Sequence, residues 1–169
     1  MTLSFVQMAL NNAYANRTLY GAISELGQAE FMTPRPGFFP SLSKTLNHIY
    51  EVDLFYVDAL EEGGLGRSVF ERTDIEDVKA LASAQAEVDL RLAVFCGSDP
   101  DLEKSVDVER KGLVTKEKIG AILPHLLQHQ IHHRGQAHVQ ISDAGLEPPQ
   151  LDDFFLEHGR APIAQEYFA

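Results

Sequence analysis

The sequence predicts an all-α fold: a four-helix bundle with a long crossover connection and a short C-terminal helix. Helix-breaking residues gather at 33–37, 63–66 and 97–100. The segments between them carry apolar residues at alternating steps of three and four, which puts those side chains on one face of a helix. Four helices of about 20 residues, each with one apolar face, pack most simply as a four-helix bundle. We expect one domain over residues 1–169.

The first expected helix runs from about Ser4 to Leu26. One of its faces consists of the following residues, spaced by three or four: Phe5, Ala9, Asn12, Asn16, Leu19, Ile23 and Leu26. Asn12 and Asn16 therefore interrupt an otherwise apolar stripe. A buried asparagine needs hydrogen-bond partners, so the pair predicts a polar feature in the core.

The second expected helix follows Pro40 and runs to about Leu60, with Ser41 or Ser43 as the residue that caps its N-terminus. His48 shares a face of this helix with bulky apolar residues. An imidazole in such a place is either a hydrogen-bonded core residue or a metal ligand, and the second helix alone leaves both open.

The third expected helix begins at residues 73–76, where Thr-Asp-Ile-Glu matches a capping box, and runs to about Phe95. The pattern changes over residues 99–118, where valines and a leucine flank Lys111-Gly112. This segment is compatible with a small β-hairpin or with an irregular crossover. Its length leaves room for the long crossover connection, so a simple up-and-down order of helices is not required.

The fourth expected helix runs from about Lys118 to Ser142 and is stopped by Asp-Ala-Gly at 143–145. Beyond two consecutive prolines, we expect the segment from Leu151 to His158 to form the short C-terminal helix.

The composition argues against several classes of function. There are 25 acidic and 14 basic residues, for a net charge of −11. Nucleic acids and anionic membrane surfaces both bind clustered Lys and Arg, so neither is an expected partner. No stretch approaches the ~18 apolar residues of a membrane span, and the N-terminus lacks the apolar run of a signal peptide. Cys96 is the single cysteine, and we expect it to be a small buried residue rather than a nucleophile. We expect a cytoplasmic protein.

Histidines concentrate in the fourth helix: four of the seven lie within nine positions, His125, His129, His132 and His133. On a helix, His129 and His133 lie about 40° apart around the axis and one turn apart along it, so both imidazoles can bind one ion. His125 and His129 form a rival pair with the same spacing. Catalytic metal sites take three protein ligands and keep one position open, and His48 is the candidate for the third. A polar core without a metal is the remaining alternative.

Several motifs resemble one known family. Residues 129–136, His-Gln-Ile-His-His-Arg-Gly-Gln, resemble the HxxHHRGQ signature of the DinB/YfiT-like family of proposed metalloenzymes. Residues 12–17 resemble its first-helix pattern YNxWANxR, with Tyr14 where tryptophan is usual. Residues 39–48 resemble the second-helix motif that ends in the first metal ligand, and residues 145–152 resemble a GxxPPxLD segment that follows the last helix.

The resemblance implies a four-helix bundle in a variant topology that is often a homodimer. It also implies a divalent metal ion, zinc or nickel, held by three histidines. Carried onto this sequence, the ligands are His48, His129 and His133, and His132 lies outside the coordination sphere.

Four further polar residues accompany these motifs. Gln136 lies on the face of the two helix-four ligands, where it either hydrogen-bonds near the metal or has a packing or capping role. Asn12 and Asn16 are expected to tie loops, ahead of the alternative that they orient groups next to the ligands. Arg134 is either an ion-pair partner of an aspartate at 152–153 or a contact for an anion.

The leading functional hypothesis is a metal-dependent enzyme that acts on a small molecule. Three neutral imidazoles leave the ion able to lower the pKa of bound water toward ~7 for hydrolysis, or to hold a thiol as thiolate. The resemblance favours the second, because relatives include S-transferases and an isomerase that use bacterial low-molecular-weight thiols. No glutamate accompanies the histidine pair as in HExxH, which weakens a protease-like interpretation. A metal-dependent hydrolase and a non-catalytic metal-binding or stress-response module remain the alternatives.

Overall fold

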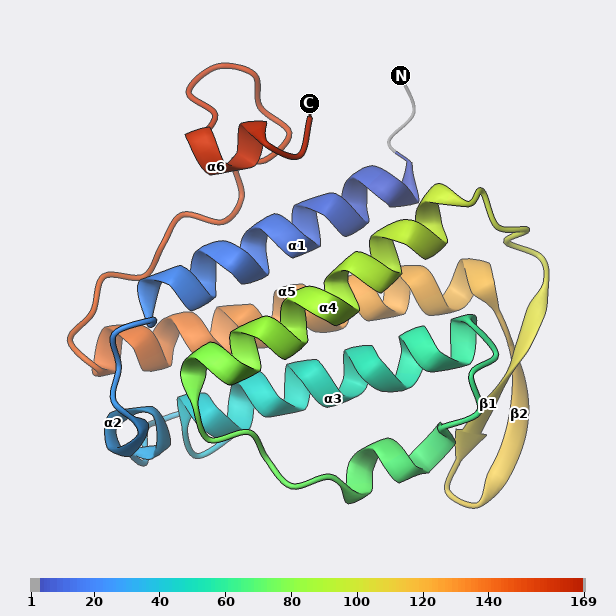
Figure 1. Ribbon diagram of the computed structural model, residues 1–169, viewed down its shortest axis with the longest axis horizontal. Coiled ribbons are helices and arrows are strands. Elements are labelled where there is room, and N and C mark those ends of the chain that lie inside the picture. Colours follow the sequence, from blue (N-terminus) through green and yellow to red (C-terminus); the bar gives the residue numbers. More distant parts are fainter. Residues whose placement is uncertain (1–3, 169) are drawn as a thin grey trace.

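Four long helices carry about half of the chain in the computed structural model, which describes residues 4–168 (Figure 1). They are α1 (Phe5–Ala22), α3 (Leu42–Leu60), α4 (Val78–Gly97) and α5 (Ile119–Asp143). The predicted all-α four-helix bundle is confirmed. The sequence did not indicate two shorter helices, α2 (Gln28–Met32) and the 3-10 helix η1 (Gly66–Glu71).

The long helices pack in an order that differs from their order in the chain. α1 packs mainly against α4, and α3 packs against both α4 and α5. α3 and α4 run in one direction through the bundle, and α1 and α5 run in the other (Figure 1). Residues 61–77, which include η1, therefore run back along the bundle between α3 and α4. This is the crossover connection. It joins α3 to α4 and so lies earlier in the chain than residues 99–118, the segment whose length had left room for a crossover.

The starts of α3 and α4 show where local sequence signals suffice and where they do not. α3 begins after Ser41, whose hydroxyl accepts a hydrogen bond from the Lys44 N–H at 3.2 Å, so Ser41 is the cap among the two candidates. α4 begins after Asp77, and the predicted capping box at residues 73–76 is wrong. The reason is a long-range contact: Asn47 on α3 accepts from the Ile75 N–H and donates to the Ile75 carbonyl, which keeps this residue in a loop.

A β-hairpin joins α4 to α5, so the hairpin is the correct alternative for this segment. Strands β1 (Ser105–Arg110) and β2 (Leu113–Lys118) are antiparallel. Lys111 and Gly112 form the turn, with φ of 48° and 81°. Positive φ at both central residues is typical of the tight turns that match the twist of a hairpin. The hairpin and η1 lie together at one end of the bundle (Figure 1).

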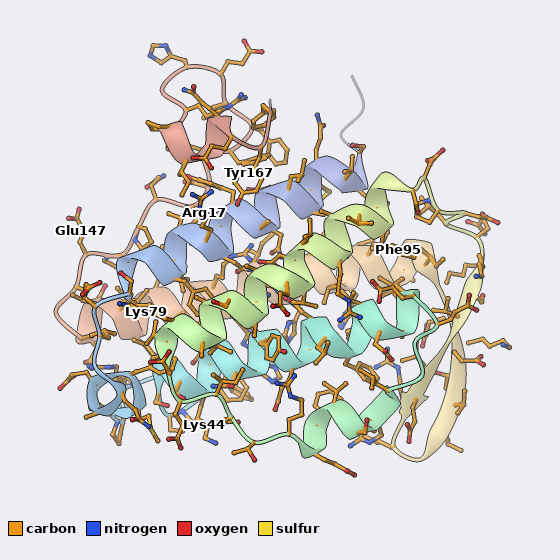
Figure 2. All side chains as sticks on the ribbon, in the orientation of Figure 1. Arg17, Lys44, Lys79, Phe95, Glu147 and Tyr167 are labelled. Atoms are coloured by element: carbon orange, nitrogen blue, oxygen red, sulfur yellow. The ribbon has the colours of Figure 1, made fainter. Side chains whose placement is uncertain are left out.

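The C-terminal segment folds differently from the prediction. Residues 151–158 form turns rather than the expected helix, and the short helix is α6 (Pro162–Gln165). The Phe154 ring is buried against Tyr14 of α1, with ring centroids 5.5 Å apart, and this contact holds the segment in an irregular path. Figure 2 shows Tyr167 and Arg17 close together where α6 meets α1. No helix within residues 4–168 has both the length and the hydropathy that crossing a bilayer requires.

Candidate metal centre

Three histidines from two helices meet at one point. His129 and His133 lie one turn apart on α5, and the packing of α3 against α5 brings His48 to them. Each of the three offers a ring nitrogen, and these atoms lie within 4.8 Å of one another. Within residues 4–168 this is the one group of three or more His, Cys, Asp or Glu side chains that could hold a metal ion.

The geometry of the three rings fits a metal ion. The Nε2 atoms of His48 and His129 are 3.0 Å apart. Two nitrogens that each lie about 2.1 Å from an ion at a tetrahedral angle are roughly 3.4 Å apart, so a small outward shift admits zinc. The buried Nδ1 of His129 has no hydrogen-bond partner within the described chain. The Nδ1 side of the His129 ring is therefore not held by a protein acceptor, and an ion between the rings would replace only the Nε2 contact of His129 with His48.

Gln136 orients the third ring. Its Oε1 lies 2.8 Å from Nδ1 of His133, and its Nε2 lies 3.0 Å from Nε2 of His132. An amide oxygen accepts, so Nδ1 of His133 carries the hydrogen and Nε2 keeps its lone pair for a ligand. His132 is exposed and stands outside the group of three. His125 also stands outside it and packs its ring on Tyr56, so the structure gathers His133 rather than His125 with His129.

The environment keeps these imidazoles neutral. Burial is the largest cause and the nearby His133 the second, and together they lower the pKa of His48 to about 4. Burial, as the largest cause, and the neighbouring histidines lower the pKa of His129 to about 3. Burial also lowers the pKa of His133, against the opposing effect of its hydrogen bond to Gln136. Neutral imidazole is the form that binds a metal, so no proton competes with an ion at pH 7.

The three rings border an open cavity of about 830 Å³. Its walls come from α3, α5, η1 and the hairpin, and they combine aromatic rings with basic side chains. Phe39 packs against His48 and His133, with ring centroids 4.5 and 5.5 Å apart. The site is therefore open to a small molecule on the cavity side and covered by an apolar ring where Phe39 lies.

Asn12 and Asn16 belong to a separate, buried cluster. Both donate to the carboxylate of Asp89 on α4, at 3.2 and 3.0 Å, and both accept from Arg134 on α5. They thus tie α1 to α4 and α5, and none of their hydrogen bonds within residues 4–168 reaches the three histidine rings. Arg134 finds its partners here and in Gln130, 3.0 Å away, rather than in an aspartate of the C-terminal segment.

The remaining members of this cluster were missed from the sequence. Gln130 donates to Asp53 on α3, and Gln85 on α4 donates to Asp53 at 2.7 Å and to Asp89 at 3.1 Å. Burial raises the pKa of Asp89 to about 6 and the pKa of Asp53 well above its ordinary value. One signal was present: Gln85 interrupts the apolar face of its helix, as Asn12 does in α1. We call Asn12, Asn16, Asp53, Gln85, Asp89, Gln130 and Arg134 the polar network.

Comparison with known proteins agrees with this architecture. The model of the DinB family matches residues 1–166. Protein DinB of Bacillus subtilis strain 168 is 22% identical over 148 residues, which cover 83% of this chain and 86% of that protein. Two solved structures share the fold, both with a TM-score of 0.63. A DinB-like protein from Bacillus cereus is 19% identical, over 81% of this chain and 90% of its own. The DinB-like protein YjoA from Bacillus subtilis is 20% identical, over 87% and 96%. The chain belongs to the DinB family.

Proposed function

We propose that His48, His129 and His133 hold one divalent ion, zinc or nickel, and that the protein transfers a low-molecular-weight thiol to a small-molecule electrophile. The observation that carries this proposal is the approach of three neutral ring nitrogens, within 4.8 Å of one another, beside an open cavity. Three protein ligands with a further position free are typical of catalytic zinc rather than structural zinc.

The chemistry follows from the donor set. When bound, an ion with three neutral ligands keeps its full charge and lowers the pKa of a coordinated thiol. The thiol gives its proton to solvent, its sulfur electron pair forms a bond to the electrophilic carbon, and the leaving group departs with its own bonding pair. Gln136 holds the His133 ring in place, and Phe39 covers the rings on one side. The cavity has room for both the thiol and the electrophile.

The thiol comes from solution in this proposal. Cys96 lies on α4, and burial raises the pKa of its thiol to about 11. Within the described chain, the residues that line the cavity do not include it. The family resemblance further supports a homodimer, which light scattering on the purified protein tests.

A metal-dependent hydrolase is the second candidate function. The observation that favours it is Glu109 of β1, which lines the same cavity. Its Oε2 accepts a hydrogen bond from the Arg67 N–H at 3.1 Å, which holds the carboxylate at the edge formed by η1. A glutamate in a metal cavity is the usual general base for activated water.

Cobalt substitution tests the proposal. Cobalt(II) should bind at one ion per chain, and added cysteine or bacillithiol should produce a thiolate charge-transfer band in the near ultraviolet. His133→Ala should lose both the ion and the band, because two ligands hold an ion weakly. His125→Ala should keep both, and His158→Ala, at an exposed position of the C-terminal segment, is the matched control.

Each result has a distinct meaning. If cobalt does not bind, the metal site is refuted. If it binds but neither thiol changes the spectrum, thiol transfer is refuted; activated-ester hydrolysis that Glu109→Gln abolishes would then support the hydrolase. A bound metal with neither activity supports the non-catalytic module.

A further inference from the structure

Basic side chains gather on one side of the cavity that the three histidines border. Arg67 of η1, Arg110 at the end of β1 and Lys111 in the hairpin turn all line it. The chain as a whole is acidic, with 25 carboxylates against 14 basic residues. The cavity reverses this balance, because within residues 4–168 Glu109 is the one acidic residue that lines it.

The positive charges of these three side chains are largely not neutralised by ion pairs. Arg67 and Lys111 form no ion pair within residues 4–168, and Arg110 has one long contact, 3.6 Å from its Nε to Glu117. The Glu109 carboxylate accepts a hydrogen bond from the backbone N–H of Arg67 and forms no ion pair with the Arg67 guanidinium. A local excess of positive charge beside low-dielectric walls raises the local concentration of anions.

Aromatic rings hold the two guanidinium groups in position. Arg110 lies over the Tyr56 ring, and Arg67 lies over the Phe70 ring, each 5.6 Å from the ring centroid. A guanidinium within about 6 Å of a ring centroid is attracted to the ring face, and the N–H groups on its edge stay available to donate. The paired donors of such an edge match the two oxygens of a carboxylate or phosphate.

The rest of the cavity wall suits an apolar body. Phe55 and Phe70 pack together with ring centroids 5.1 Å apart, and Phe38, Val52 and Leu113 add further apolar surface. We infer that the molecule bound here is an amphipathic anion, with an aromatic or similarly bulky body against these rings and an oxyanion, carboxylate or phosphate, between Arg67, Arg110 and Lys111. The inference rests on the proposed function, because it names the substrate class of the same site.

Binding of matched probes tests this inference on the full-length protein. We compare 3-phenylpropanoate, phenyl phosphate and the neutral 3-phenylpropanamide by calorimetry at low salt, with zinc and after chelation. The two anions should bind about tenfold or more tightly than the amide, with or without zinc, because charge-assisted hydrogen bonds replace neutral ones. The ratio between the anions identifies which oxyanion fits better. The preference should shrink as salt is raised.

Variants locate the source of the preference. The double variant Arg67→Gln, Arg110→Gln should bring the anions to within about twofold of the amide, since both residues are exposed and glutamine keeps much of their bulk. Arg91→Gln is the matched control, because Arg91 pairs with Glu61 and does not line the cavity. Its preference for anions should equal that of the wild type.

The inference is overturned if acid and amide bind equally, if no probe binds at millimolar concentration, or if the preference survives in the double variant. A preference seen only with zinc also overturns it, because the anion is then a metal ligand. Zinc titration separates the two proposals. A protein that binds no zinc but prefers anions refutes the metal site alone, and one that binds zinc without preferring anions refutes the oxyanion pocket alone.

Discussion

The histidine site and the polar network meet on α5, where residues of the two lie one position apart, and they differ in how their polar groups find partners. His129 and His133 of α5 face the cavity, while the next residues, Gln130 and Arg134, face the closed interior. A step of one residue turns a side chain by about 100° around a helix. Most polar atoms of the network find partners within it, across α1, α3, α4 and α5, and within residues 4–168 the buried Asp53 Oδ1 and Gln85 Oε1 are left without one. The three rings instead converge on a point that an ion would fill.

This contrast separates stability from ligand binding within a single stretch of sequence. Removing a network residue leaves its partners buried without hydrogen bonds, so the whole fold is weakened. Removing a residue of the histidine site leaves the interior unchanged and weakens only the binding of a metal. The predictions below test this separation, beginning with the largest expected effect.

Replacing Arg134 should destabilise the protein most. Arg134→Met takes the positive charge away from the buried Asp53 and Asp89, and breaking a buried charged network typically costs about 3–5 kcal/mol. Urea denaturation of the metal-free protein measures the free energy of unfolding. Arg91→Met, which removes a partly exposed arginine, should cost less than about 1 kcal/mol. An equally small loss for Arg134→Met would show that the network contributes nothing to stability.

Gln136 should affect metal binding and leave stability nearly unchanged. Gln136→Ala removes the acceptor for Nδ1 of His133, and loss of such a partner typically lowers metal affinity about 10- to 100-fold. Competition with a chromophoric chelator measures the zinc affinity. Gln136→Glu keeps an acceptor in place and should retain affinity close to that of the wild type. Equal losses in the two variants would mean that the hydrogen bond does not orient the ring.

The polar network should make the free energy of unfolding fall as pH rises, which is the opposite of the usual effect of a carboxylate whose pKa is lowered by folding. Burial raises the pKa of Asp89 to about 6 in the folded state, above its unfolded value of 3.8, so between these values the folded state holds more protons. Stability contributed by this group is therefore present at low pH and is lost as pH rises from about 4 to about 6, with a slope of up to about 1.4 kcal/mol per pH unit.

The histidines act in the opposite direction over the same range, so the comparison requires a variant. The lowered pKa values of His48 and His129 cost stability as pH falls below about 6.5. Asp89→Asn removes this carboxylate, and subtracting its pH profile from that of the wild type cancels the histidines and leaves Asp89 together with its effect on the pKa of Asp53. The difference should show the wild type gaining stability relative to the variant as the pH is lowered from 7 to 4.5. A flat difference would contradict a raised pKa.

Features set by local spacing were predictable from the sequence. The bundle follows from apolar stripes at helical spacing, and His129 and His133 form a pair because four residues make about one turn. Ser41 was one of two cap candidates, because a serine hydroxyl caps an N–H only a few residues away. His48 entered as the candidate for the third ligand from its helix face, and the family resemblance then assigned it together with His129 and His133, because periodicity does not say which helices are neighbours.

Features set by contacts between distant segments were not predictable. α4 starts late because Asn47 binds Ile75, 28 residues away, and the C-terminal helix is displaced because Phe154 packs on Tyr14. Asp53 and Asp89 were overlooked because each lies among apolar neighbours, and most of their partners come from other helices.

The pairing of α1 with α4 has a consequence for synthesis on the ribosome. Asn12 and Asn16 bond to Asp89, which lies 77 and 73 residues later in the chain. At a translation rate of about 5–20 residues per second, α1 is made roughly 4 to 15 s before its partner helix. During that interval its apolar face and both asparagines have no native surface to pack against. The nascent N-terminal half should therefore depend on transient protection, by the exit tunnel or by chaperones, until α4 has emerged.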